Sequence, residues 1–365
     1  MIAWLLISFF VLLFLGVPIA MSLGLSAMGG ILFLGGGSTV TIAQRMFEGM
    51  NSFALLAIPL YTFAGFTMSK GGISKRLMDF CYSIVGHIYG GLAHVNVLSS
   101  MIFAGISGSA VADTAGVSGM FMPEMVRKGY SKNFTVAVTA ISSTIGIIIP
   151  PSIPMVVIAG ICGISTGKLF LGGIIPGVLC GLAQMIVSYF LAKKEGVPKE
   201  PGHFTIGPVL HGLWESWPAL LMPIIIVGTI TMGIVSPTEA GVIAVVYGLF
   251  AGGIIYRELK WEDIKFAFAE TVRTSGRIFI VIGAAKLYTV MLTTAGFDKW
   301  VAKTMLGFST NPTVILIMIL LIFFIVTMFM ESIATLTLFM PILYPIALGV
   351  GIDPIVLSVL ITVVI

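Results

Sequence analysis

The stretch that decides the fold opens MIFAGISGSAVADTAGVSGMFMPEM (101–125) and closes AISSTIGIIIPPSIP (140–154). It is apolar enough to lie in a membrane, yet the run GISGS (105–109) places two glycines and two hydroxyls within five residues, and Asp113 follows. Irregular backbone at membrane depth is tolerated only where protein buries it or where it lines a wet cavity. An ionisable residue in such a place favours a functional site. We therefore expect the rest of the chain to hold and move this broken segment.

The composition excludes a soluble protein. Of the 365 residues, 58% are hydrophobic and 9% are charged, whereas a soluble domain has roughly 25% charged residues. Apolar stretches recur along the whole chain, and about 20 such residues suffice to cross a bilayer core. The sequence predicts an all-α polytopic membrane protein.

Several function classes find no support in the residues. The net charge of +4 is spread over short loops, so no basic face suggests a nucleic-acid partner. No H-E-x-x-H or Walker A pattern is present, which argues against an enzyme and against ATP-driven transport on this chain. The three cysteines and four histidines lack metal-ligand spacing, so we expect no transition-metal site.

The chain divides into two similar halves around a polar linker. Residues 1–192 form a first predicted repeat, residues 193–217 the linker, and residues 218–365 a second repeat. Each half begins with a long apolar run that is broken, at Gly16-Val17-Pro18 and at Ser236-Pro237-Thr238-Glu239. Each then has an amphipathic stretch suited to the membrane interface, 39–51 and 257–276, followed by apolar spans and a broken segment.

Matching residues support the repeat. Phe121-Met122-Pro123 matches Phe339-Met340-Pro341 at an offset of 218, which takes Asp113 to Glu331. A four-residue slip then takes 129–132 to 351–354. Repeats with interrupted segments at corresponding positions indicate the binding site of a secondary transporter. A second Pro-Pro break would fall at about residue 372 on this register, so we expect the second crossover to be incomplete in a chain ending at Ile365.

The residue types at the breaks suit a hard cation such as Na⁺. Ser107, Ser109 and Asp113 lie at the first break, and Ser142, Ser143, Thr144 and Gly146 precede the second break at Pro150-Pro151. Hydroxyls, a carboxylate and the carbonyls of a discontinuous helix are ligands for such an ion. The corresponding site in the second half would use Glu331, Ser332 and Thr335. The alternative roles of Asp113 are a helix N-cap or a partner for Arg127 or Lys128.

Three motifs resemble one family. Residues 105–116 (GISGSAVADTAG), 147–160 (IIIPPSIPMVVIAG) and 329–354 (FMESIATLTLFMPILYPIALGVGIDP) are similar to the large (M) membrane subunit of the tripartite ATP-independent periplasmic (TRAP) transporters. The resemblance covers essentially the whole chain. It implies two inverted repeats of the ion-transporter superfamily. Each has scaffold helices, an interfacial arm, a re-entrant hairpin (93–125 and 313–350) and a broken crossover helix, the first of these 134–164.

The resemblance also implies function and partners. It implies Na⁺-driven uptake, by an elevator movement, of an organic acid delivered by a periplasmic substrate-binding (P) protein. A small four-helix (Q) membrane subunit completes the scaffold, and the location is the bacterial inner membrane. Sialic acid and C4-dicarboxylates are both substrates of the family, and no residue here chooses between them.

The resemblance assigns the sites by position. Two or more Na⁺ ions are expected, and the one assignable site joins the first hairpin tip to the first crossover, with Ser107, Gly108, Ser109, Asp113, Thr144, Gly146, Ile149 and Pro150. The residues expected to bind substrate or a second ion are Pro151, Ser152, Glu331, Ser332 and Thr335. The family usually has Asp where Glu331 stands, and the second Pro-Pro crossover is absent.

Two other functions are compatible with the residues. A stand-alone Na⁺/dicarboxylate carrier of the same superfamily would need no binding protein. A channel or assembly scaffold would use the broken segments only for packing, and mutation of Asp113 to Asn would then leave coupled uptake intact.

Overall fold

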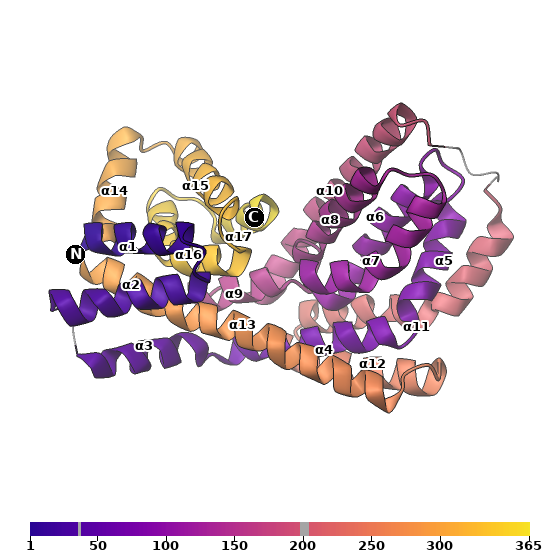
Figure 1. Cartoon of the computed structure of the whole chain (residues 1–365), viewed down its shortest axis with the longest axis horizontal. Coiled ribbons are helices and arrows are strands. Elements are labelled where there is room, and N and C mark those ends of the chain that lie inside the picture. The colour runs from indigo at the N-terminus through magenta and orange to yellow at the C-terminus, as the bar shows by residue number, and fades with distance from the viewer. Residues whose placement is uncertain (36–37, 198–203) are drawn as a thin grey trace. The chain divides into compact units, whose positions relative to one another are not determined.

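The computed structural model describes residues 1–35, 38–197 and 204–365, and these residues form helices joined by turns, with no strand among them (Figure 1). The all-α prediction is confirmed. The helices of the first half are α1 (Ile2–Phe14), α2 (Ile19–Leu34), α3 (Thr39–Met50), η1 (Phe53–Leu56), α4 (Ala57–Lys70), α5 (Ile73–Val85), α6 (Gly91–Ser107), α7 (Ala110–Arg127), α8 (Lys132–Ser143), η2 (Thr144–Ile147), α9 (Ile153–Cys162) and α10 (Thr166–Lys194). Those of the second half are α11 (Ile206–Thr231), α12 (Pro237–Phe250), η3 (Ala251–Ile255), α13 (Trp261–Thr294), α14 (Phe297–Phe308), α15 (Pro312–Thr327), α16 (Ser332–Gly349) and α17 (Pro354–Val364).

Several helices are suited to cross a bilayer. Within the described residues, six are long and apolar enough: Phe53–Lys70, Thr166–Lys194, Ile206–Thr231, Pro237–Ile255, Trp261–Thr294 and Ser332–Gly349. On α10, large apolar side chains at 175, 179, 182, 186 and 190 are exposed at helical spacing. A contiguous apolar stripe of this kind marks a surface that contacts lipid or another protein.

The chain forms two compact units that do not coincide with its two halves. Unit 1 contains Met1–Leu56, Pro154–Thr166 and Thr274–Ile365, and unit 2 contains Ala57–Ile153 and Gly167–Arg273. Each unit therefore draws on both predicted repeats. The division into repeats 1–192 and 218–365 stays a prediction.

The opening run of unit 1 is a helical hairpin. Gly16 has φ +81°, a left-handed conformation that favours glycine, and Pro18 precedes α2. The two helices then pack on each other, because the Trp4 Nε1–H donates to the Ser26 carbonyl oxygen at 3.3 Å. Tyr288 of α13 donates its hydroxyl to the Leu5 carbonyl at 2.8 Å. The break at Gly16-Val17-Pro18 therefore separates two helices and is not a kink within one.

The second amphipathic stretch is longer than expected. The predicted arm 257–276 and the following span are one helix, α13, which continues through Ser275-Gly276. Gly276 keeps a negative φ and has open space around it, so a single glycine only lowers helix stability by about 1 kcal/mol and does not end the helix. The first amphipathic stretch forms α3, which has no buried residue and is capped by Ser38. Its place at the membrane interface stays a prediction.

The predicted linker is shorter in the structure. Helix α11 already begins at Ile206, so residues 206–217 are helical, and residues 198–203 lie outside the described residues. Packing in unit 2 explains the difference. Ser216 is buried and donates to the Arg76 carbonyl at 2.9 Å. A Cβ on Gly212 would lie 3.2 Å from the Phe80 Cα, so α11 packs closely on α5.

Asp298 and Lys299 lie in a helix. Helix α14 begins after Gly296, whose φ is +80°, and Met305 is its buried residue. The two charged residues occupy its first turn, where an acidic group is favourable for the helix dipole.

Candidate functional site

The first hairpin is broken at its tip. Helix α6 ends at Ser107, and Gly108 takes φ +63° before α7 begins. Ser109 is the N-cap of α7, and its Oγ accepts from the Ala112 N–H at 3.4 Å. The Ser109 N–H in turn donates to the Ser107 Oγ at 3.4 Å. A left-handed turn favours Gly, and a helix N-cap favours Ser. The GISGS run therefore explains the break.

The crossover segment is broken beside this tip. After η2, residues 148–152 are not helical, and the Pro150–Pro151 peptide is cis. The Ile153 N–H donates to the Gly108 carbonyl at 3.0 Å. A Cβ on Gly146 would lie 3.3 Å from the Ser109 carbonyl oxygen. The two breaks therefore touch through backbone atoms, as the sequence predicts for a hairpin tip facing an unwound crossover.

Asp113 is buried without a hydrogen-bond partner. The residue has 0% exposure, and within the described part of the chain neither carboxylate oxygen accepts a hydrogen bond. The hydroxyls of Ser100 and Ser143 lie beside the carboxylate. Their hydrogen bonds run elsewhere: Ser100 donates to Ser142, and Ser143 donates to the Thr139 carbonyl. An unpaired buried carboxylate costs several kcal/mol, so this group calls for a cation or a proton.

The two alternative roles of Asp113 do not hold. The N-cap of α7 is Ser109, and Asp113 lies one turn inside the helix. Arg127 pairs with Glu124 at 2.6 Å. No basic side chain donates a hydrogen bond to the Asp113 carboxylate among the described residues.

A buried polar network joins α6 to α8 next to Asp113. Asn96 donates through Nδ2 to the Thr139 hydroxyl at 2.8 Å, and its Oδ1 accepts from Ser142 at 3.0 Å. Ser142 also accepts from Ser100 at 3.2 Å. Sequence reasoning missed Asn96, Ser100 and Thr139. The signal was available, because Asn96 and Ser100, and Thr139 and Ser143, stand four residues apart on one helix face in apolar runs.

The donor set suits an alkali cation better than a transition metal. The described residues contain no group of three His, Cys, Asp or Glu side chains that could hold a metal. One carboxylate, serine hydroxyls and backbone carbonyls are hard oxygen ligands. The C-terminal ends of α6 and η2 also point negative dipole ends at this place.

The remaining predicted residues of the first site, and Pro151 and Ser152 of the second predicted set, lie around the break. Thr144 is exposed and donates to the Ile141 carbonyl at 2.7 Å, so its hydroxyl is used within its own helix turn. Ile149 packs against Gly177 of α10. Pro150 and Pro151 are buried, and Ser152 donates to the Ile147 carbonyl at 2.5 Å.

The second predicted set is divided: Pro151 and Ser152 lie in unit 2, and Glu331, Ser332 and Thr335 lie in unit 1. Glu331 is the N-cap of α16, and its Oε2 accepts from the N–H groups of Ile333 and Ala334 at 3.0 and 3.2 Å. Thr335 donates to the Glu331 carbonyl at 3.2 Å. Ser332 donates to the Ile365 carbonyl at 3.4 Å. An ion or substrate role for these three residues stays a prediction.

The helix starts correct the register of the repeat. The N-caps Ser109 and Glu331 are 222 residues apart, and so are the N-caps Ser131 and Asp353 of α8 and α17. The offset of 218 placed Asp113 opposite Glu331. In the structure Glu331 corresponds to Ser109 instead, because the four-residue slip already applies at the hairpin tip.

Comparisons with known proteins agree with this architecture. Residues 6–365 match the family model described as "Tripartite ATP-independent periplasmic transporter, DctM component". The chain is 36% identical over 344 residues to the sialic acid TRAP transporter large permease protein SiaM of Vibrio cholerae. It is 37% identical over 342 residues to the C4-dicarboxylate TRAP transporter large permease protein DctM of Pseudomonas aeruginosa. Each alignment covers 94% of this chain and 80% of the relative.

A further relative is longer. The chain is 38% identical over 347 residues to the isethionate TRAP transporter permease protein DctMQ of Oleidesulfovibrio alaskensis, covering 95% of this chain and 55% of that protein. The chain thus spans about half of this relative and four fifths of the other two. It belongs to the DctM component family of the tripartite ATP-independent periplasmic transporters, multi-pass permeases of the bacterial inner membrane that are transporters and not enzymes.

Proposed function

We propose that this permease couples the inward movement of Na⁺ to the import of an organic acid. The first Na⁺ binds where the α6–α7 tip meets the break after η2, and the Asp113 carboxylate is its charged ligand. The observation that carries this proposal is the buried Asp113 carboxylate, which no hydrogen bond of the described residues satisfies.

Na⁺ binding drives transport as a linked equilibrium. An ion that binds one arrangement of the hairpin shifts the carrier toward that arrangement by its differential affinity for the two states. Bound Na⁺ neutralises Asp113 and holds Gly108 and Ser109 against Gly146 and Ile153, which are already in backbone contact. The arrangement with an ordered tip then favours substrate binding, and an elevator movement carries ion and substrate across the membrane.

The partners follow from the three-part organisation of the family. A periplasmic substrate-binding protein delivers the acid, and a small Q subunit completes the membrane part. The DctMQ relative of Oleidesulfovibrio alaskensis supports the second partner, since its name joins the M and Q components. The substrate is an organic acid of the sialic acid or C4-dicarboxylate type.

Uptake into proteoliposomes tests the proposal. The permease is reconstituted with its small subunit, and labelled succinate, isethionate and N-acetylneuraminate are offered separately. Each is offered with and without an inward Na⁺ gradient and with and without the cognate binding protein. We expect accumulation of one acid class that requires both the gradient and the binding protein.

Other outcomes separate the alternatives. Uptake that needs Na⁺ but no binding protein would favour the stand-alone carrier. Current that passes with no fixed ratio of ion to substrate would identify a channel and contradict the proposal. Hydrogen exchange gives a second check: Na⁺ must increase the protection of residues 105–113 and 144–152 from exchange, and unchanged protection would refute the linkage.

A further inference from the structure

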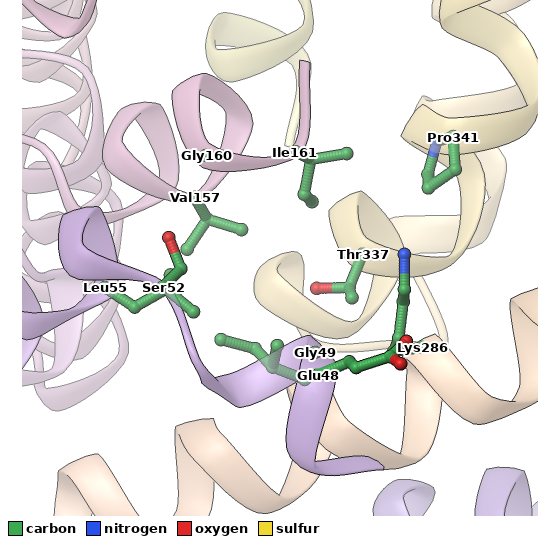
Figure 2. Close-up of a pocket in the computed structure, with 11 residues that line it drawn as sticks. Glu48, Gly49, Ser52, Leu55, Val157, Gly160, Ile161, Lys286, Thr337 and Pro341 are labelled. Carbon is green, nitrogen blue, oxygen red and sulfur yellow. The ribbon is translucent and has the colours of Figure 1, made fainter. Parts of the chain in front are cut away.

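Unit 1 contains a cavity of about 200 Å³ that the sequence did not predict (Figure 2). It is enclosed by α3, η1, α9, α13 and α16, all within this unit. Gly49 and Gly283 let α3 and α13 approach closely: a Cβ on Gly49 would lie 2.6 Å from the Lys286 Cβ, and one on Gly283 would lie 3.2 Å from the Met46 carbonyl oxygen. The cavity therefore has packed walls rather than a loose surface.

One unpaired cation lines this cavity. Lys286 lies in the apolar helix α13, and Figure 2 shows its ammonium group extending toward Thr337 and Pro341 of α16. Within the described residues, no carboxylate lies within ion-pair distance of Lys286. A lysine inside a spanning helix is costly, faces a cavity or partner, and favours a functional role.

The other charge in the cavity is already neutralised. Glu48 also lines the cavity, but it forms an ion pair with Arg45 at 2.8 Å. The cavity therefore keeps one net positive charge from Lys286. Ser52 and Thr337 add hydroxyl oxygens, and the rest of the wall is apolar, as at Leu55, Val157 and Ile161. An apolar pocket with few polar groups and one charge is typical of a small-molecule site.

We propose that Lys286 binds the acidic group of the transported substrate in this cavity. A cavity of about 150 Å³ admits a molecule the size of benzene, so a cavity of about 200 Å³ has room for a small organic acid. This inference rests on the proposed function, and it adds to it a substrate-binding residue outside the Na⁺ site.

Thermal unfolding of the permease in nanodiscs tests the inference. The wild type is compared with K286Q, K286R and the matched control K303Q, which removes an exposed lysine of α14 in the same unit. Succinate, isethionate and N-acetylneuraminate are titrated at saturating Na⁺. We expect at least one of the three acids to raise the Tm of the wild type and of K303Q. K286Q needs an acid concentration at least roughly tenfold higher for the same Tm shift, because it loses a charge-assisted hydrogen bond. K286R retains most of the Tm shift.

The Na⁺ response serves as the folding control. Na⁺ alone raises the Tm of all four proteins, because the Asp113 site lies in the other unit. An equal response to that acid in K286Q and wild type would overturn the role of Lys286. If Na⁺ itself had no effect on the wild type, the proposed function would fail instead.

A lipid arm separates the two sources of an anionic group. The titrations are repeated in phosphatidylcholine nanodiscs with and without phosphatidylglycerol. A Lys286-dependent Tm shift that comes from phosphatidylglycerol, with no shift from any acid, would assign the cavity to a lipid headgroup and overturn the substrate proposal.

Discussion

The two helical hairpins place their carboxylates differently. In the α6–α7 hairpin, Asp113 lies one turn inside the second helix, fully buried and without a hydrogen-bond partner among the described residues. In the α15–α16 hairpin, Glu331 is the N-cap itself, exposed and engaged with two backbone N–H groups. The first carboxylate destabilises its surroundings unless a cation binds, whereas the second stabilises its own helix.

The two hairpins also differ in how they pack: the first through polar side chains and the second through aromatic rings. The first is joined to α8 by the side-chain network of Asn96, Thr139 and Ser142. The second is packed through rings, with Phe323 of α15 edge-on to Phe339 of α16 at 6.4 Å between centroids. A polar network responds to a nearby charge, whereas ring packing does not. We therefore expect ion binding to change the interactions of the first hairpin and to leave those of the second unchanged.

The largest effect is expected from D113N. The substitution keeps the shape of the side chain and removes its charge, so Na⁺ affinity falls about 100-fold, equivalent to roughly 3 kcal/mol. Without Na⁺ the variant is at least as stable as the wild type, because no unpaired buried carboxylate remains. The measurement is the Tm across a Na⁺ titration, in parallel with uptake.

E331Q is the matched variant in the other hairpin. It weakens an N-cap and lowers stability by about 1 kcal/mol, while the Na⁺ dependence of the Tm stays that of the wild type. Equal losses of Na⁺ response in both variants would show that the two carboxylates act alike and would remove the contrast drawn here.

The second prediction concerns the contact between the two breaks. A Cβ at Gly108 would overlap the Pro151 carbonyl oxygen, and Gly108 has φ +63°. Gly351, at the end of the second hairpin, has φ +83° but open space around it. G108A and G351A therefore share the backbone strain of about 1 kcal/mol, and only G108A also pushes the breaks apart, at a further cost of about 1–3 kcal/mol.

Na⁺-dependent uptake and unfolding measure this difference. G108A is expected to lower both stability and Na⁺ affinity, and G351A to lower stability alone. A normal Na⁺ affinity in G108A would mean that the Gly108–Pro151 contact does not form part of the ion site.

The sequence predicted what strong local signals encode. The left-handed glycine and the capping serine of GISGS, and the double proline after η2, each end a helix whatever surrounds them. Both breaks are therefore found where the sequence places them.

Features that depend on packing between helices could not be predicted from local sequence signals. Gly276 has the same chemistry as Gly108, yet it continues α13, because nothing there requires a left-handed residue. The pairing of Asp113 with Glu331 rested on the Phe-Met-Pro match. Only the N-caps, which are seen in the structure, reveal the four-residue slip. Lys286 in an apolar run was a signal that the sequence analysis did not use, but only the structure shows the cavity that it lines.

The smallest expected effect lies in the polar network. A double-mutant cycle with N96L and T139V measures the coupling between the two side chains, for which a buried hydrogen bond between membrane helices gives about 0.6 kcal/mol. A second cycle with F323L and F339L measures the ring contact of the other hairpin. Because Ser100 and Ser142 link Asn96 toward Asp113, the first coupling should change when Na⁺ is added, and the second should not. A coupling of Asn96 to Thr139 that is the same with and without Na⁺ would mean that the network only holds α6 on α8, and that ion binding at Asp113 is not transmitted through it.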